Sequence, residues 1–201
     1  LPIWSFAVLA LLVGSGAALW QASMARSESA VANATRAFLV DLFQTVKVFE
    51  GGLDASLDRP VRDLLLEGGR RLLDDRSLAP AVRLDLLRTL GGMHSRLSLL
   101  EGAERMGAEA LALTKQVHGA TSEAWVQAAI EHGATLTRAG RPHEAMRLLG
   151  EALQVMEQTG RSRTETHTLL LLELGDAAFD AEDMRAASYL AGAIDAFSAH
   201  H

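Results

Sequence analysis

Histidine and serine side chains are the groups in this sequence that could act on a substrate or hold a metal ion. The seven histidines are His94, His118, His132, His143, His167, His200 and His201. No two of them have the His-x-x-x-His spacing with a following carboxylate that a metal-binding helix requires. His94 and His132 fall in segments expected to be first helices of repeats, where packing or lining of a groove is the expected role. No serine stands in a Gly-x-Ser-x-Gly motif, so a nucleophilic serine is not supported.

Glycine pairs and acidic pairs offer no catalytic pattern either. Gly-Gly occurs at 51–52, 68–69 and 91–92, and none of these pairs lies between a strand and a helix, as a phosphate-binding loop would. The acidic pairs at 74–75 and 182–183 fall at expected helix ends, where capping accounts for them. We therefore expect no catalytic residue, no metal and no cofactor in this chain.

Composition excludes two more classes of function. The 201 residues carry a net charge of −6, and lysine occurs only at Lys47 and Lys115, so the basic patch that nucleic acid requires is missing. The absence of cysteine excludes disulfides, thiolate zinc sites and cysteine nucleophiles. High Ala and Leu content with four prolines favours helix almost throughout, and we predict an all-α chain.

The first segment, residues 1–22, is predicted to be a transmembrane helix. No charged residue occurs before Arg26, and a run of about 20 apolar residues spans the roughly 30 Å hydrocarbon core of a bilayer. Trp4 and Trp20 stand at its two ends, where aromatic rings prefer the interface. A signal peptide with small residues near Ala25 is the alternative, but no basic region precedes the apolar run.

One face of this segment carries small residues at every fourth position, namely Ala10, Gly14 and Ala18. Small side chains let two membrane helices approach closely, so this stripe predicts a homodimer. Residues 23–80 are expected to form a helical adaptor, with the first helix continuing to about Phe43. Gly51-Gly52, several acids and Pro60 mark residues 45–60 as a loop within it.

The remainder, residues 81–201, repeats with a period of 42 residues. Glycine recurs at Gly91, Gly133 and Gly175, whereas alanine recurs at 103, 145 and 187 and again at 110 and 152, with Ile194 in the third copy. Half a repeat extends upstream, where Val61, Leu64 and Gly68 occupy the columns of 103, 106 and 110. Small residues at fixed positions allow two antiparallel helices to pack closely, and each hairpin leaves an apolar face for the next to cover.

These columns resemble the tetratricopeptide repeat (TPR), in the 42-residue form found in kinesin light chains. The resemblance covers Leu84 to about Ser198 and predicts repeats at about 84–125, 126–167 and 168–201. It implies an α-solenoid of antiparallel hairpins, wound as a right-handed superhelix, that binds a protein or peptide. The usual Trp and Tyr of the repeat are missing, and Ile194 departs from the last alanine column.

The order of the segments resembles the C-terminal half of bacterial transmembrane serine/threonine protein kinases. The matching elements are Phe38-Leu39 with Leu42-Phe43, Val61 with Leu64-Leu65, and residues 84–91. This resemblance implies a single-pass protein of the bacterial inner membrane, held in the bilayer by residues 1–22, with its repeats outside the cytoplasm and its kinase upstream. Two alternatives stay open: a membrane-anchored or secreted scaffold for envelope complexes, and the sensor half of a membrane-bound winged-helix regulator.

The TPR resemblance also implies where a ligand binds, because first helices of successive hairpins line a concave groove. Helical spacing places the following residues in that groove: Asp85, Arg88, Ser95 and Arg96 from the first repeat, Gln127, Ile130, Thr137 and Arg138 from the second, and Leu172, Asp176 and Phe179 from the third. Among them, Arg88, Arg96 and Arg138 are the candidates to clamp a carboxylate of a peptide.

Overall fold

The computed structural model describes Ala37 and residues 58–162 and 164–198. The predicted transmembrane segment 1–22 and its stripe of Ala10, Gly14 and Ala18 lie outside these ranges, as does most of the predicted loop 45–60. Within the described ranges, no helix has the length and apolar character needed to cross a bilayer.

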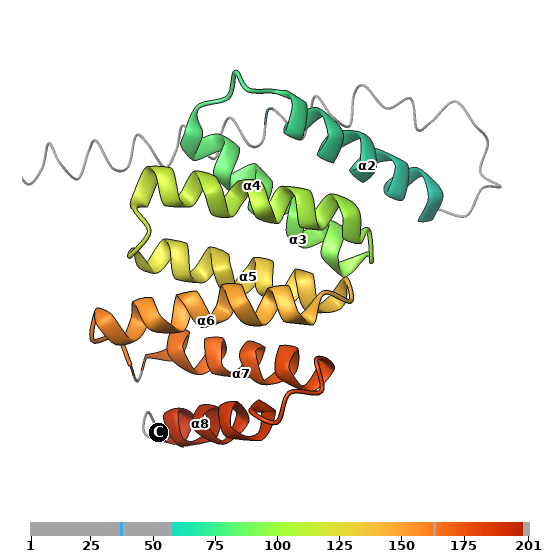
Figure 1. The fold of residues 1–201 in the computed structure, drawn as a ribbon. Coiled ribbons are helices and arrows are strands. Elements are labelled where there is room, and N and C mark those ends of the chain that lie inside the picture. The colour runs from blue at the N-terminus through green and yellow to red at the C-terminus, as the bar shows by residue number, and fades with distance from the viewer. Residues whose placement is uncertain (1–36, 38–57, 163, 199–201) are drawn as a thin grey trace, which may run out of the picture. The chain divides into compact units, whose positions relative to one another are not determined.

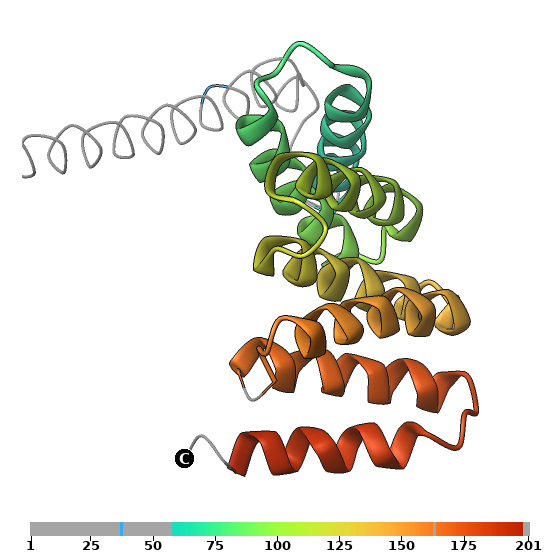
Figure 2. The same ribbon diagram turned by 60° about the vertical axis from the view of Figure 1, so that its left-hand side comes forward.

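Helices are the only regular secondary structure in the described part of residues 48–201, which forms one compact unit. Its helices in chain order are α2 (Asp58–Asp74), α3 (Pro80–Arg96), α4 (Leu100–His118), α5 (Glu123–Arg138), α6 (Pro142–Gln158), α7 (Glu165–Asp180) and α8 (Ala186–Ser198). Each helix packs against the next along the chain, and the stack runs from α2 to α8 in sequence order (Figures 1 and 2). The all-α solenoid expected from the repeats is confirmed.

Three hairpins make up most of the stack: α3 with α4, α5 with α6, and α7 with α8. They begin three or four residues before the predicted repeat limits of 84, 126 and 168. Helix α2 precedes them as a single helix that contacts both α3 and α4, in the place of the predicted half repeat. It begins at Asp58, so the last residues of the predicted loop are helical.

The turns inside the hairpins repeat with the same period as the helices. One residue with positive φ closes each first helix: Ser98, Gly140 and Glu182, which are 42 residues apart. At these turns Leu99, Arg141 and Asp183 donate their backbone N–H to a carbonyl five residues back. These bonds satisfy carbonyls that the end of a helix leaves without a partner. The helix starts are fixed as well, since Ser122 and Thr164 cap α5 and α7 with their side-chain oxygens.

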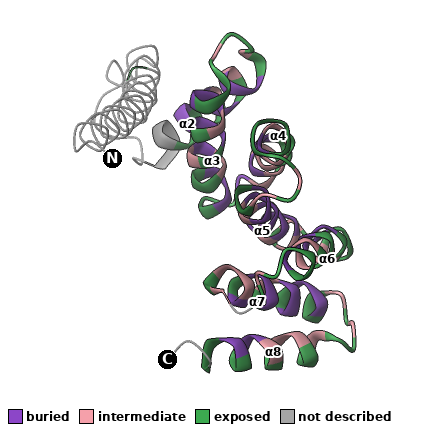
Figure 3. Ribbon diagram, turned by 90° about the vertical axis from the view of Figure 1, so that its left-hand side faces the viewer, coloured by how far each residue is buried: buried purple, intermediate pink, exposed green. Residues whose placement is uncertain are grey.

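Small residues in the first helices let the two helices of a hairpin approach closely. A Cβ atom added at Gly133 would lie 2.7 Å from the Leu149 side chain, and one at Gly175 would lie 2.5 Å from that of Leu190. Both glycines are buried, and the burial follows the facing sides of the helices (Figure 3). The predicted role of these glycine columns is confirmed in the second and third hairpins.

The third hairpin departs from the period by one residue. The columns place Ala187 and Ile194 at the contact with α7, but Ala187 is exposed and Ile194 is 65% exposed. Ala193 is buried instead, and Leu190 rather than residue 191 covers Gly175. The turn at Glu182 keeps the 42-residue period, so the one-residue change of register arises between Glu182 and Leu190. We call this change the slip. In this stretch the link into α8 is longer than the corresponding link into α6.

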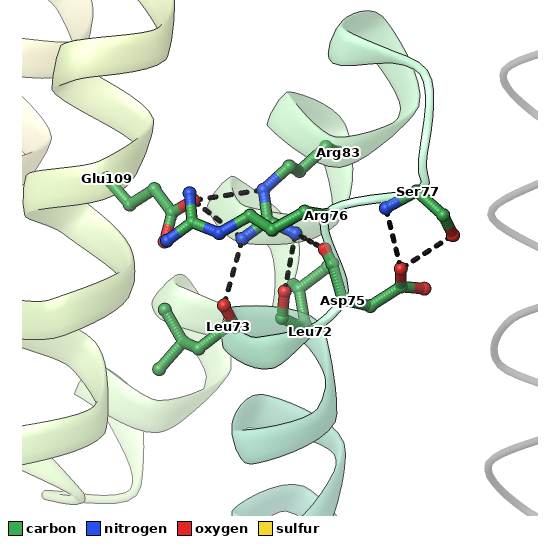
Figure 4. Close-up of polar contacts among 7 residues, drawn as sticks. All are labelled: Leu72, Leu73, Asp75, Arg76, Ser77, Arg83 and Glu109. Atoms are coloured by element: carbon green, nitrogen blue, oxygen red, sulfur yellow. Dashed lines mark hydrogen bonds and ion pairs between the residues drawn. The ribbon is translucent and has the colours of Figure 1, made fainter.

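A buried arginine fixes the N-terminal end of the stack (Figure 4). The Arg83 side chain in α3 is 6% exposed and pairs with Glu109 of α4, with 2.6 Å between Nη2 and Oε1. Its guanidinium also donates to the carbonyls of Leu72, Leu73 and Asp75 at the C-terminus of α2. One side chain therefore joins three helices and satisfies carbonyls that α2 cannot pair internally.

Replacement of Arg83 by alanine should be strongly destabilising. It leaves three backbone carbonyls without their donor and the Glu109 carboxylate with only the exposed Arg76, and loss of one partner from a buried pair typically costs about 3–5 kcal/mol. Arg76→Ala is the matched control, since Arg76 pairs with the same carboxylate (2.8 Å) from an exposed position. Urea unfolding should show a large loss for Arg83→Ala and almost none for Arg76→Ala. Equal losses would contradict the role given to Arg83.

A second pair of variants tests the one-residue slip. Ala145 and Ala187 occupy the same column of the 42-residue period, but Ala145 is 0% exposed whereas Ala187 lies on the surface. Ala145→Leu should lower the free energy of unfolding by about 1–3 kcal/mol through overpacking. Ala187→Leu should leave the urea midpoint unchanged. If both variants unfold alike, α8 follows the plain period and the slip is wrong.

Candidate functional site

The first helices α3, α5 and α7 lie on one side of the stack, and α4 and α6 lie on the other (Figure 3). α5 packs directly against α7, but α3 and α5 are not among the helix pairs in close contact. The space between α3 and α5 forms a hollow of about 590 Å³. We call it the α3–α5 groove.

Most of the predicted groove residues line this hollow. Seven do so: Asp85, Arg88, Ser95, Arg96, Gln127, Ile130 and Arg138. The structure therefore brings these residues of α3 and α5 to one hollow. Ile130 belongs to the floor, because it is only 3% exposed.

The four other candidates lie elsewhere. Leu172 lines a second hollow of about 580 Å³ with Leu169 and Phe197, on the α7 side of Gln127. Neither hollow includes Thr137, Asp176 or Phe179. The Thr137 hydroxyl donates to the Gly133 carbonyl of its own helix (3.1 Å), and Phe179 projects into solvent with 74% of its surface exposed.

Small residues floor the α3–α5 groove. Gly91, Ala103, Gly107 and Ala110 reach it from α3 and α4. In the next hairpins, Leu149 and Leu190 cover the glycines that correspond to Gly91. In the first hairpin, Gly107 stands in the column of Leu149, so no leucine covers Gly91 and it stays partly exposed. The groove therefore reaches the second helix of this hairpin.

The Arg88 guanidinium is already engaged by a carboxylate. It pairs with Glu131 of α5, with 3.0 Å between Nε and Oε2, and this bond raises the pKa of Arg88. Sequence reasoning missed Glu131, although opposite charges at a spacing of 43 residues were readable. A second contact at this spacing joins Thr166 Oγ1 to Glu123 (3.0 Å), so first helices are linked by polar pairs.

Arg96 and Arg138 differ from Arg88, since neither forms an ion pair within the described ranges. Arg138 lies near Glu173 of α7, whose pKa is raised by burial and by Asp176 and is lowered in part by Arg138. Ser95 stands beside Arg96 and is 7% exposed, and its hydroxyl has no hydrogen-bond partner among the described residues. These groups offer unused hydrogen-bond donors to a ligand.

The histidines set aside as packing residues are buried. His94 is 1% exposed, its Nδ1 lies 2.9 Å from the Leu90 carbonyl oxygen, and burial lowers its pKa. Among the described residues, no group of three His, Asp or Glu side chains could hold a metal ion.

Comparison with known proteins supports the TPR interpretation. The tetratricopeptide repeat family model matches residues 83–123 and 133–159, which confirms tetratricopeptide repeats over these two ranges. The crystal structure of BtubC (BKLC) from P. vanneervenii is similar to the chain with a TM-score of 0.56 and 16% identity, and the alignment covers 71% of this chain. It covers 57% of that protein, so the chain spans little more than half its length. No curated protein sequence matches the chain significantly.

TPR repeats generally bind protein partners, and the architecture is that of a protein-interaction scaffold. At 16% identity, the similarity to BtubC shows the fold alone.

Proposed function

We propose that the α3–α5 groove binds a protein segment through a carboxylate, either an acidic side chain or a C-terminus. The observation that carries this proposal is the pair Arg96 and Arg138, which line one groove without an ion pair in the described part of the chain. Guanidinium groups bind carboxylates through two parallel hydrogen bonds, which suits them to this ligand.

Ser95 adds to the same site. A buried hydroxyl without a partner costs about 1–3 kcal/mol, and a ligand that accepts its hydrogen bond recovers part of that cost. Ser95 and Arg138 are 43 residues apart, the separation at which Arg88 meets Glu131 across the groove. A ligand carboxylate between α3 and α5 would therefore meet Ser95, Arg96 and Arg138 together.

Arg88 has a different role from the one expected. Because Glu131 neutralises it, Arg88 is not an available clamp, and a ligand carboxylate would first have to displace Glu131. Exposed pairs of this kind contribute about 1 kcal/mol or less. We therefore propose that Arg96 and Arg138 bind the carboxylate of the ligand. The Arg88–Glu131 ion pair has a structural role instead and connects α3 to α5.

In the whole protein, we propose that the repeats are the extracytoplasmic interaction or sensor region of a transmembrane signalling protein. The support is the uncharged apolar run of residues 1–22 and the resemblance of the segment order to transmembrane serine/threonine kinases. On this proposal residues 1–22 contact the lipid bilayer of the bacterial inner membrane and the stripe of Ala10, Gly14 and Ala18 supports a dimer. The sequence upstream of Leu1 would distinguish a kinase from a scaffold or a winged-helix regulator.

The groove proposal predicts the behaviour of a double variant. An array of peptides with free C-termini and varied acidic content serves as the probe for the full chain. Arg96→Ala with Arg138→Ala should reduce binding of carboxylate-bearing peptides at least tenfold, because each lost charge-assisted bond is worth about 1.5–3 kcal/mol. The melting temperature should be unchanged, since neither arginine is buried.

Arg105→Ala provides the matched control. Arg105 is exposed and lines a hollow formed by α4, α6 and one face of α5, outside the α3–α5 groove. This variant should bind the peptides as the wild type does. Equal binding by the wild type and the double variant would overturn the proposed carboxylate site.

A further inference from the structure

His132 and Gly107 are matched exceptions to the repeat. His132 stands in a column that holds leucine at Leu90 and Leu174, and Gly107 stands in the column of Leu149. The two meet at the joint between α4 and α5, where a Cβ atom on Gly107 would lie 2.6 Å from His132 Nδ1. The imidazole of the second hairpin thus occupies space that a leucine at position 107 would need.

One nitrogen of the His132 imidazole lacks a hydrogen-bond partner at this position. His132 is 9% exposed, and its Nδ1 has no hydrogen-bond partner among the described residues. Its ring lines the α3–α5 groove and also the hollow between α4 and α6. The pKa of His132 is lowered, chiefly by burial, with the Glu104 carboxylate opposing that shift and the Arg141 guanidinium reinforcing it.

Charged groups line both hollows that His132 borders. The hollow between α4 and α6 holds Glu104, Arg105, Arg141, Glu144 and Arg147. The α3–α5 groove holds Asp85, Arg88 and Arg96 from α3, Glu131 and Arg138 from α5, and Glu173 from α7. Glu104 and Glu144 both bind Arg141. Arg141 therefore keeps one carboxylate if Glu104 turns to another cation.

We propose that the contact between α4 and α5 is an acid-sensitive hinge. On protonation, the His132 imidazole leaves the space beside Gly107 and moves toward Glu104. A charged imidazole must donate hydrogen bonds from both nitrogens, and Nδ1 has no acceptor among the described residues where it now lies. Glu104 and Glu144 line the hollow that His132 also borders, and of the two carboxylates Glu104 favours the charged imidazole more strongly. When the ring leaves, nothing fills the space beside Gly107, so the contact between the first and second hairpins loosens.

The direction of the pH effect follows from the lowered pKa. The neutral ring is the form that packs, so the joint is fully closed above the ordinary histidine pKa of about 6.5. As pH falls below that value, protonation favours states in which the ring is solvated, and stability is lost until pH falls through the folded-state pKa. This hinge acts whether or not the groove binds a carboxylate, so it does not rest on the proposed function.

Hydrogen exchange on the full chain at pH 7.5 and pH 5.5, corrected for intrinsic exchange, tests the hinge. Opening of α4 and α5 should increase at pH 5.5 by up to about tenfold, because that pH lies one unit below the pKa of about 6.5 that the imidazole has when solvated. His132→Leu restores the residue of Leu90 and Leu174 and should abolish the increase at this joint. His143→Gln alters an exposed histidine of α6 and should retain it.

Two outcomes would overturn the proposal: opening that is equal at both pH values, or an increase that persists in His132→Leu. Increased exchange confined to α2 and α3 would do the same, because it would assign acid sensitivity to His94. If the leucine variant fails to fold, an NMR titration of the His132 ring in the wild type decides. A midpoint well below 6.5 that falls further in Glu104→Gln supports the hinge, and an ordinary midpoint rejects it.

Discussion

The close approach of two helices over a glycine is the contact on which the rest of this structure depends. Gly133 lies beneath Leu149, and Gly175 lies beneath Leu190. A side chain at either glycine would collide with the leucine and force the hairpin open. Each hairpin leaves an apolar face that the next one covers, and α5, α6, α7 and α8 pack in sequence order.

The groove arises where this contact is relaxed. In the first hairpin the leucine is replaced by Gly107, so Gly91 is uncovered and the space between α3 and α5 reaches α4. The same replacement leaves room for His132 at the joint between the hairpins. The change at Gly107 therefore opens the concave hollow and also makes room for the buried imidazole of His132 beside it. Arg83 joins α4 to α2 and α3, which keeps this hairpin in place.

Sequence periodicity predicted the hairpins well because small residues and turns recur at a fixed spacing. Ser98, Gly140 and Glu182 close the first helices 42 residues apart, although only one of them is a glycine. The period wrongly predicted that Ala187 and Ile194 would be buried against α7. A change of register in the link before α8 turns a different face of that helix toward α7, and the residue types along the helix give no sign of it.

Interactions that join separate helices were harder to predict than the helices themselves. The period gave no sign of Arg83, whose partners include backbone carbonyls that no side-chain pattern reveals. On the groove, spacing placed Arg88, Arg96 and Arg138 on one side but did not reveal that Glu131 neutralises Arg88.

The central claim, that the concave side of the first helices binds a protein partner, therefore depends on the arginines that keep their donors free for a ligand. Peptides selected from a random library on the full chain, followed by hydrogen exchange of the complex, test it most directly. We predict protection of α3, α5 and the start of α7, where the two hollows lie, and none on the outer faces of α4 and α6. Protection confined to α4 and α6 would contradict the account.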